Sequence, residues 1–430
     1  MKKILICGAG KSATVLIEYV CSLCAEYNWR LLLCDSDLAL AQSKIIHCKN
    51  ARAISLDVAN DIKRSNLIQE ADIVISMLPP HLHFLVATDC LNFSKHLLTA
   101  SYIDEKIKVL NNEIERKGLL FLCEMGLDPG IDHMSAMKII NDVKKEGGKI
   151  TSFKSHCGGL VSPESDDNPW HYKITWNPAN IVMAGSSGAM YRSMGETVEI
   201  PYKNVFLDCK EVDIPGLPAL AWYPNRDSLT YINAYGLNEA DTFIRTTLRY
   251  PSFCRAWNKI VNMGLTDLND YEEIKHCKTY SEWYQKKKKL AEALPCSNKT
   301  EQEFVKQIDY LGLCSNAVIE TEIKSSASLL QDILEKKLSM QPHDKDMIVM
   351  LHEIGYEING ETKMLRASLV VTGEDQKKTA MAKTVGLPLG IAAKLILQNK
   401  IKLTGLHIPV LPQIYEPVLT ELEEHQIKFQ

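Results

Sequence analysis

The sequence predicts an α/β protein with a doubly wound parallel sheet at the N-terminus, a second α+β domain and an all-helical insertion. Short apolar runs alternate with helix-period segments over the first 123 residues, and a glycine turn follows the first of these runs. Strand texture is later lost to helical periodicity and then returns. We therefore expect a first domain over 1–128 that is rejoined by about 378–410, a second domain over 129–251 and 336–377, and a helical insertion over 252–335.

The glycine turn Cys7–Ala13 follows the apolar run Ile4–Ile6 and has the G-x-G-x-x-G/A spacing of dinucleotide-binding folds. Gly8 would make the tight turn, Gly10 would leave room for the phosphates, and Ala13 would let the next helix pack close to the strand. The free N–H groups at the start of that helix favour an anion. The pattern predicts a Rossmann domain whose turn binds the dinucleotide through Gly8, Gly10, Lys11, Ser12 and Ala13.

A second apolar run, Trp29–Cys34, ends in Asp35, about where these folds place an acid that binds the adenosine ribose. Ser36 is expected to lie beside the same ribose. A 2′-phosphate would be repelled by Asp35 and Asp37, so we expect NAD to be preferred, with NADP as the second choice. Lys44 would partly offset this repulsion if its helix turns inward. The alternative is that Asp35 caps a helix in an unrelated α/β domain.

Six apolar runs are the candidate strands of this sheet: Lys3–Cys7, Trp29–Cys34, Ala53–Asp57, Asp72–Ser76, His96–Thr99 and Leu119–Cys123. The intervening segments Ile62–Glu70 and Lys106–Lys117 have the polar faces of covering helices. Ligands of such sheets bind beyond the carboxyl ends of the strands. Strand exits therefore add candidates for binding the dinucleotide, namely Asp57, Val58, Ile75, Thr99, Leu127 and Asp128.

The composition is ordinary for a soluble protein, with 46% hydrophobic and 24% charged residues among 430. The formal net charge of −4 provides no basic surface, so we expect no nucleic-acid partner. We also expect no membrane span and no signal peptide. The 13 cysteines are scattered in the manner of reduced thiols, which favours a cytoplasmic location.

Beyond the sixth strand the texture changes, and residues 150–247 are rich in Gly, Pro, Asn and Ser. The run Lys286–Lys289 is expected to form a solvated helix face. We predict extended pieces at Thr151–His156 and Lys173–Trp176, helices over Ser281–Leu294 and Glu301–Leu311, strands at Met347–Tyr356 and Leu365–Thr372, and a helix from Thr379 to about Leu397.

The segment Glu124–His133 leaves the sixth strand and enters a helix, so its acids and histidine are expected to face the crevice. Asp128, desolvated beside a nicotinamide, could exchange protons with an amine or imine. Alternatively, Asp128 and Asp132 only cap the following helix. Asp132 and His133 lack a second ligand pair at helical spacing, so no metal is expected.

Polar groups in the later domain are suited to an anionic small molecule. Cys157 precedes two glycines and could act as an acid or base, although a buried structural cysteine is commoner. Arg226, Arg245 and Arg249 are expected in polar loops, where guanidinium groups grip carboxylates in two-point fashion. Surface ion pairs with nearby acids are the alternative for each arginine.

The chain resembles saccharopine dehydrogenases of the L-glutamate-forming type over nearly its whole length. The segments that carry the resemblance are Ala100–Ile103, Glu124–His133, Cys157–Leu160, Asn168–Pro169, Tyr172–Lys173, Tyr223–Ser228, Thr247–Tyr250, Thr379–Pro388 and Ile414–Tyr415. The resemblance implies NAD(P)-dependent oxidative cleavage of saccharopine to L-glutamate and 2-aminoadipate 6-semialdehyde, or the reverse condensation. It also implies that the second domain binds substrate and forms a homodimer.

Residue roles follow from the same resemblance. Tyr102, Asp128 and Cys157 match the positions nearest the reacting C–N bond. Asn177 is added to the residues that bind the dinucleotide. The implied substrate contacts are Ser101, Tyr102, Asp128, Arg226, Thr247, Leu248 and Arg249.

Three places depart from the family pattern, namely Val161-Ser162, Trp170-His171 and Asn177-Pro178. Because these places are expected where cofactor and substrate meet, a second enzyme remains open, one that acts on another amino-acid-linked imine such as carboxynorspermidine. A non-catalytic dinucleotide-binding redox sensor is the alternative from another class.

Overall fold

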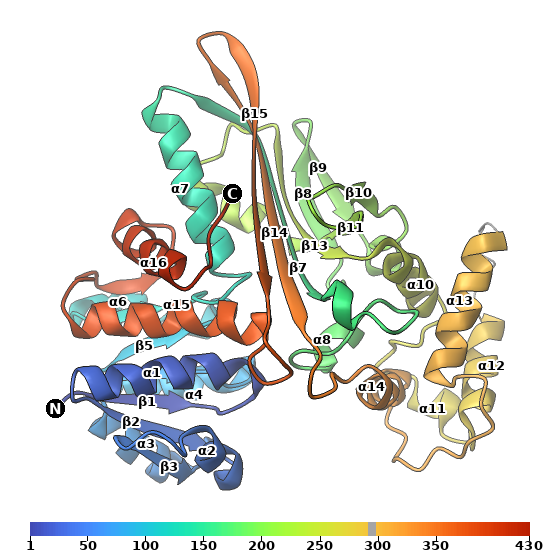
Figure 1. Ribbon diagram of the computed structural model, residues 1–430, viewed down its shortest axis with the longest axis horizontal. Helices are drawn as coiled ribbons and strands as arrows, with labels where there is room; N and C mark the ends of the chain where they lie inside the picture. The colour runs from blue at the N-terminus through green and yellow to red at the C-terminus, as the bar shows by residue number, and fades with distance from the viewer. Residues whose placement is uncertain (291–297) are drawn as a thin grey trace. The chain divides into compact units, whose positions relative to one another are not determined.

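The computed structural model describes residues 1–290 and 298–430 and divides into two compact units (Figure 1). Unit 1 consists of residues 1–146 and 373–430, and unit 2 consists of residues 147–372. The segment predicted to rejoin the first domain, 378–410, lies in unit 1. Unit 1 also contains residues 129–146, which the sequence analysis assigned to the second domain, because helix α7 (Ile131–Lys145) packs against α16 (Pro412–Glu424).

Unit 1 is built on a seven-stranded sheet in the order β16-β6-β5-β4-β1-β2-β3, and every pair in it is parallel. The strand order reverses between β1 and β4, so the carboxyl ends of these two strands form a topological switch point. The predicted α/β class is confirmed, and the structure adds a seventh strand near the C-terminus. The strands are β1 (Lys3–Cys7), β2 (Arg30–Asp35), β3 (Ala51–Ser55), β4 (Ile73–Ser76), β5 (His96–Thr99), β6 (Leu120–Leu122) and β16 (Gly405–His407).

The helices of unit 1 cover this sheet. The segment Lys106–Lys117, predicted to be helical, contains two helices, because the first ends at its C-cap Val109 and the second begins after its N-cap Leu110. The remaining helices besides α7 and α16 are α1 (Thr14–Glu26), α2 (Leu38–Lys44), α3 (Asp61–Glu70), α4 (His83–Asn92), α5 (Glu105–Lys108), α6 (Asn111–Arg116) and α15 (Ala380–Leu397), with one-turn helices η1 (Lys11–Ala13) and η2 (Pro80–Leu82).

Helix α15 lies along α1, as Figure 1 shows. Thr379 caps it by accepting the N–H of Ala382 at 2.9 Å. Gly386 lets the two helices approach, because a Cβ atom there would lie 2.8 Å from the backbone nitrogen of Leu16. Among the described residues α15 is also the one helix long and apolar enough to cross a membrane, but most of it is buried inside unit 1.

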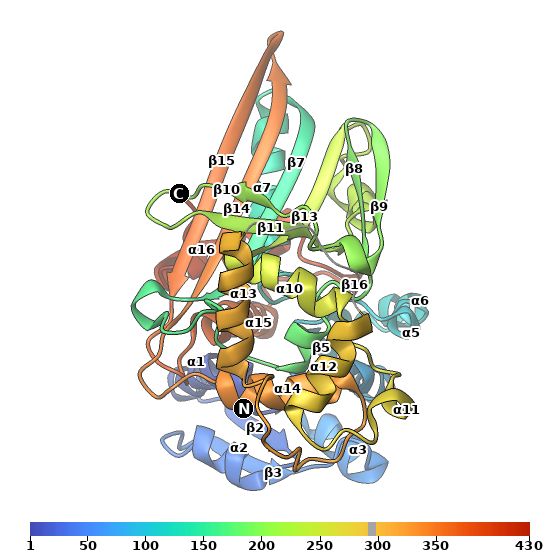
Figure 2. The ribbon, with the colours of Figure 1, turned by 90° about the vertical axis from the view of Figure 1, so that its right-hand side faces the viewer.

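Unit 2 is built on a nine-stranded mixed sheet whose main path is β10-β11-β13-β7-β14-β15 (Figure 2). Its two longest strands, β7 and β14, are antiparallel, whereas β13 pairs with β7 in parallel. The strands are β7 (Lys149–Val161), β8 (Ala189–Ser193), β9 (Glu196–Ile200), β10 (Lys210–Val212), β11 (Leu220–Pro224), β12 (Arg226–Asp227), β13 (Thr242–Arg249), β14 (Asp346–Ile358) and β15 (Glu361–Thr372).

Helices of unit 2 gather between β13 and β14 in the chain, where the insertion was predicted. The predicted helix Ser281–Leu294 ends at Leu290 in α12, and its residues 291–294 lie outside the described residues. The helices are α8 (Ala179–Val182), α9 (Ile232–Tyr235), α10 (Pro251–Asn262), α11 (Tyr271–Ile274), α12 (Tyr280–Leu290), α13 (Asn298–Leu311) and α14 (Ser326–Lys337), with one-turn helices η3 (Pro163–Ser165), η4 (Tyr202–Asn204) and η5 (Leu229–Tyr231).

The structure differs from two predictions for segments that contain lysines. The run Lys286–Lys289 is not wholly solvated, because Lys287 is buried and its amine lies 2.6 Å from the Asp270 carboxylate. Lys173–Trp176, predicted as an extended piece, forms no strand and contains an isolated bridge from Ile174 to Ser339. In both places a buried lysine pairs with an acid outside its own segment, Asp270 for Lys287 and Asp344 for Lys173, which local patterns do not reveal.

Gly386→Ala should lower the free energy of unfolding by about 1–3 kcal/mol, although alanine favours helix, because the new methyl group meets the backbone of α1. Gly390→Ala is the matched control in the same helix. Its new Cβ would lie 2.5 Å from a side-chain atom, Cδ1 of the Tyr19 ring, and not from the backbone of α1. Urea unfolding of the two variants measures the difference, and equal losses would contradict the close approach at Gly386.

Candidate functional site

The glycine turn has the geometry that a dinucleotide requires. Gly8 has φ +104°, and a Cβ atom there would lie 2.8 Å from the carbonyl oxygen of Met77, at the end of β4. A Cβ atom on Gly10 would meet no protein atom within 4 Å, so this side of the turn is open. Ala13 is buried in η1. The turn thus leaves space for phosphates where the sequence predicts them, and Lys11 and Ser12 lie in it.

Asp35 ends β2 and points back at the turn. Its carboxylate accepts the N–H of Ala9 at 2.7 Å and the N–H of Asp37 at 3.0 Å, and the Ser36 hydroxyl lies 3.4 Å away. Helix α2 is capped by Asp37 instead, which accepts the N–H of Leu40 at 3.0 Å. The alternative that Asp35 is a helix cap is therefore wrong.

Lys44 turns inward from the last turn of α2. Its amine donates to the hydroxyl of Thr14 at 2.5 Å, and Thr14 in turn donates to the carbonyl oxygen of Lys11 at 2.9 Å. Burial and the charge of Lys377 lower the pKa of Lys44. A cationic group thus lies beside the glycine turn, as the offset suggested for Asp35 requires.

The other predicted dinucleotide residues of unit 1 differ in what they expose. Asp57 is exposed at the end of β3 and accepts the N–H of Ala59, whereas Val58 is buried. Ile75 lies inside β4 with a fully buried side chain, so a ligand at that strand end meets the residues that follow. Thr99 and Leu127 are also buried.

A buried histidine that the sequence analysis did not select connects two strand ends. His83, in the first turn of α4, lies with Nδ1 2.8 Å from the hydroxyl of Ser76 and Nε2 2.8 Å from the hydroxyl of Ser101. Ser76 ends β4, and Ser101 follows β5 together with Tyr102, which is half-buried. Burial lowers the pKa of His83 to about 4. In the sequence, His83 is marked only by its position shortly after the end of an apolar run, and no motif includes it.

The segment 124–133 was expected to present its acids and histidine to the crevice, but only Asp128 within it is not buried. Glu124 accepts from Nε2 of His133 at 2.8 Å, and Asp132 accepts the N–H of Gly130 at 2.6 Å. Gly130 is the N-cap residue of α7, and the acid that serves it is Asp132. Asp132 thus binds the backbone at the start of α7, although no side chain caps that helix, and Asp128 is the acid of the segment that stays partly exposed.

In unit 2, predicted site residues come together on one face of the sheet. Cys157 of β7 pairs with Thr247 of β13, and Thr247 pairs with Tyr223 of β11, so the three lie side by side. Arg249 is two residues beyond Thr247 on the same face. The prediction that Arg245 and Arg249 lie in polar loops was therefore wrong, because both belong to strand β13. Polar alternation on a half-buried strand was mistaken for loop texture.

Arg249 is set among aromatic rings. Its guanidinium lies 5.4 Å from the ring centre of Tyr172 and 5.8 Å from that of Phe253, and it donates to the carbonyl oxygen of Leu248 at 2.7 Å. Burial raises the pKa of neighbouring Tyr223 to about 12, so that phenol stays neutral. The Nε atom of Arg249 is buried and has no hydrogen-bond partner among the described residues. This donor is available for a carboxylate.

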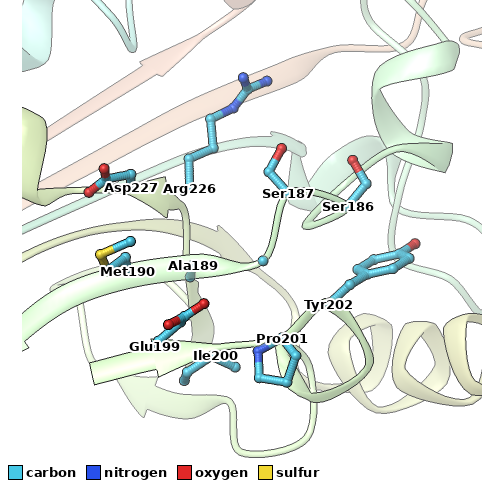
Figure 3. A pocket seen from close by; sticks show the side chains of 11 residues that line it. Ser186, Ser187, Ala189, Met190, Glu199, Ile200, Pro201, Tyr202, Arg226 and Asp227 are labelled. Atoms are coloured by element: carbon cyan, nitrogen blue, oxygen red, sulfur yellow. The ribbon is translucent and has the colours of Figure 1, made fainter. Parts of the chain in front are cut away.

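Arg226 lies elsewhere in unit 2, at the rim of a pocket of about 210 Å³ that Thr247 and Arg249 do not line. It is exposed and has φ 50°, in the left-handed region. Figure 3 shows its side chain extending to the same side as the hydroxyls of Ser186 and Ser187. The pocket therefore offers a cation and two hydroxyls to a ligand.

Two sequence expectations in unit 2 need correction. Leu248 points to the opposite face from Thr247 and packs in an apolar cluster with Leu220 and Val349, so only its backbone faces the site. Trp170 is fully buried in the core of the helical insertion, where its indole donates to the carbonyl oxygen of Gln307 at 2.9 Å. The departure from the family pattern at Trp170 thus alters packing and not a binding surface.

Other predicted features of unit 2 lie at its surface. Asn177 is exposed and accepts the N–H of Ala179 at 3.0 Å, ahead of α8. His171 pairs with Asp166 at 2.6 Å, and this bond raises the pKa of His171. In the part of the chain that the structure describes, no group of three or more His, Cys, Asp or Glu side chains could hold a metal ion. Every cysteine in that part is a free thiol.

Two family models together match nearly the whole chain. The model described as the saccharopine dehydrogenase NADP binding domain matches residues 4–122, and the one described as the saccharopine dehydrogenase C-terminal domain matches residues 126–427. A solved structure of apo saccharopine dehydrogenase (L-Glu forming) from Saccharomyces cerevisiae has a TM-score of 0.91 and 31% identity and covers 100% of this chain and 99% of that one.

Curated relatives fall into two groups by length. The chain is 34% identical to alpha-aminoadipic semialdehyde synthase of Mus musculus, across 100% of this chain and 47% of that protein, so it spans about half the length of that relative. It is 32% identical to saccharopine dehydrogenase (NADP(+), L-glutamate-forming) of Saccharomyces cerevisiae, across 98% of this chain and 97% of that protein. The resemblance drawn from the residues is confirmed, and the chain belongs to the saccharopine dehydrogenase family.

Proposed function

We propose that this protein is an oxidoreductase that cleaves saccharopine reversibly. Saccharopine, an oxidised nicotinamide dinucleotide and water would give L-glutamate, 2-aminoadipate 6-semialdehyde, the reduced dinucleotide and a proton. The observation that carries the proposal is the match to the yeast enzyme named L-glutamate-forming, which extends over 97% of that enzyme. Activity on another amino-acid-linked imine and a non-catalytic sensor are not favoured by any relative's name.

The side chains in unit 2 support a substrate with several carboxylates. Saccharopine has three carboxylates and a secondary amine. Arg249 has a buried Nε donor without a partner in the described residues, and Arg226 offers a second cation at the pocket in Figure 3. Guanidinium groups bind carboxylates by paired, charge-assisted hydrogen bonds. Two separate arginine positions fit two of the three carboxylates.

Asp128 is the proposed acid and base for the amine and for the attacking water. It is the one residue of segment 124–133 that is not buried, and the backbone around it is held by the N–H of Gly126 on the carbonyl oxygen of Pro129 at 3.0 Å. A carboxylate at a fixed, partly desolvated position suits proton exchange with an amine. Tyr102 and Cys157 are proposed to place or relay protons, as the resemblance implies.

The residues of the glycine turn fit a dinucleotide, whose nicotinamide would accept a hydride when bound. Gly10 leaves the turn open, and Ala9 and Asp35 hold its shape through their hydrogen bond. We place the pyrophosphate at the turn and the adenosine ribose at Asp35 and Ser36. These side chains bind and orient, and none of them takes part in proton transfer.

The preference for NAD that Asp35 predicted conflicts with the names of the fungal relatives and of the family model, which carry NADP. We propose that NADP is accepted and favoured. The carboxylate of Asp35 is already engaged by two backbone N–H groups, and Lys44 lies on the same side as the turn through its bond to Thr14. Lys44 and the nearby Lys377 would offset the repulsion between Asp35 and a 2′-phosphate.

The predicted homodimer and the predicted cytoplasmic location remain proposals. The outer edge of β15 pairs with no other strand in the described residues, which leaves a backbone edge for a second copy of the chain. Free thiols throughout the described residues suit a reducing compartment.

Purified protein with saccharopine and NADP or NAD should give an increase in absorbance at the wavelength of the reduced dinucleotide. Carboxynorspermidine is the control substrate. Reduction with carboxynorspermidine alone would move the assignment to the second enzyme. A protein that binds the dinucleotide but reduces it with neither substrate would overturn the proposed function.

Asp128→Asn should lower kcat for saccharopine cleavage at least about a hundredfold, because the amide keeps the size of the side chain but cannot accept a proton. The melting temperature should change little. Asp132→Asn is the matched control, since its carboxylate accepts the N–H of Gly130 at the start of α7 and should affect stability first. A large loss of stability with intact kcat in Asp128→Asn would instead favour a structural role.

Asp35→Asn should raise the ratio of kcat/KM for NADP over NAD about tenfold, which corresponds to one lost charge repulsion of about 1.4 kcal/mol. The amide oxygen can still accept the N–H of Ala9. Asp37→Asn is the control, because that carboxylate is engaged as the cap of α2, so its loss should change the ratio less than the loss of Asp35. An unchanged ratio would mean that the ribose lies away from Asp35, and a wild-type preference for NAD would refute the proposed cofactor.

A further inference from the structure

His83 bridges the ends of two parallel strands. Its ring is 3% exposed and lies between Ser76, which ends β4, and Ser101, which follows β5. Each ring nitrogen lies 2.8 Å from one of the two serine hydroxyls. Because the carboxyl ends of these strands form the crevice edge, the histidine joins two positions on that edge.

The ring is neutral when the protein works near neutral pH. Burial is the main cause of its low pKa of about 4, and the charge of His81 acts in the same direction. Asp104 opposes this shift without reversing it. A neutral imidazole has one donor nitrogen and one acceptor nitrogen, so the choice of tautomer sets the direction of both serine hydrogen bonds.

The two hydroxyl oxygens around Nε2 favour the tautomer that carries its proton on that nitrogen. Besides Ser101, the hydroxyl of Thr99 lies 3.4 Å from Nε2, and that hydroxyl also accepts the backbone N–H of Ser101 at 3.2 Å. An N–H at Nε2 would thus face two hydroxyl oxygens. Nδ1 is then the acceptor and takes the proton of the Ser76 hydroxyl.

This arrangement leaves the proton of the Ser101 hydroxyl undirected within the protein. If Nε2–H donates to Ser101, the serine's own O–H must point elsewhere. Its hydroxyl has no partner other than the His83 ring in the described residues. Ser101 is half-buried, so its O–H can reach a ligand. A hydroxyl makes its strongest hydrogen bonds to a charged acceptor such as a carboxylate.

We infer that His83 is a positioning residue for substrate binding, which fixes Ser101 as a hydrogen-bond donor toward a carboxylate of the substrate. The inference rests on the proposed function for the identity of that substrate. His83 touches no reacting atom in this account. It holds Ser101 in place. It also prevents the opposite arrangement, in which the Ser101 hydroxyl would donate to the ring.

Two variants of similar size separate the ring's two contacts. His83→Gln places an amide near the position of Nε2, so it keeps a donor for Ser101. His83→Asn places its amide near Nδ1, so it keeps the contact with Ser76 only. We expect His83→Asn to raise KM for saccharopine about tenfold, with a smaller change in kcat, and His83→Gln to stay within about threefold of wild type.

A cycle with Ser101 tests whether the effect passes through that hydroxyl. Ser101→Ala should raise KM by a similar factor, and His83→Asn should add little in the Ser101→Ala background. His96→Asn is the matched control, because His96 is another histidine of unit 1, with a pKa lowered by burial, that accepts the N–H of Leu120 at Nδ1. It should leave KM unchanged.

The tautomer can be read without turnover. Nitrogen-15 spectra of labelled protein should show His83 as a neutral Nε2–H ring that does not titrate between pH 5 and 9. An Nδ1–H ring, titration near pH 6.5, or an unchanged KM in His83→Asn would overturn the inference. If the wild-type protein fails to cleave saccharopine, the proposed function falls, while the spectra still decide the orientation of the hydrogen bonds.

Discussion

The position of the proposed acid depends on a close approach of backbone between Gly126 and Gly130. A Cβ atom on Gly130 would lie 2.0 Å from the carbonyl oxygen of Gly126, so no side chain fits there. The N–H of Ile131 reaches the same carbonyl at 2.9 Å and starts α7. The buried pair Glu124 and His133 lies at the two ends of this loop. The backbone of this loop is therefore fixed, and it holds Asp128 at one position.

The parts of the fold that could be predicted from sequence are those that a local sequence pattern determines. The glycine turn, the six apolar runs and the capped helix after Thr379 are of this kind, and the structure has an element at each. Long-range pairing carried the rest. Lys287 is buried because Asp270 approaches it, and Arg249 faces rings from other elements. The Asp270–Lys287 pair spans 17 residues and the Tyr172–Arg249 contact spans 77, so no short local pattern predicts them.

The candidate site was predictable to the same degree. Residues at strand ends, such as Asp35 and Asp128, follow from the rule for open parallel sheets. His83 could not be found in this way, because its importance comes from two serines that only the sheet brings near it. Leu248 shows the opposite limit, since it was selected with its neighbours although alternate residues of a strand face opposite sides.

Unit 1 is made from two pieces of chain that are separated by the whole of unit 2. Its hydrogen bonds include one between Tyr19 and Glu421, whose sequence separation is 402 residues. Strand β16 completes a sheet whose other strands are synthesised far earlier, and helix α15 packs on α1. During translation the first strands must therefore wait, with the apolar face of α1 uncovered, until unit 2 has left the ribosome. The Rossmann half of this protein is consequently the part most exposed to chaperones and to aggregation before the chain is finished.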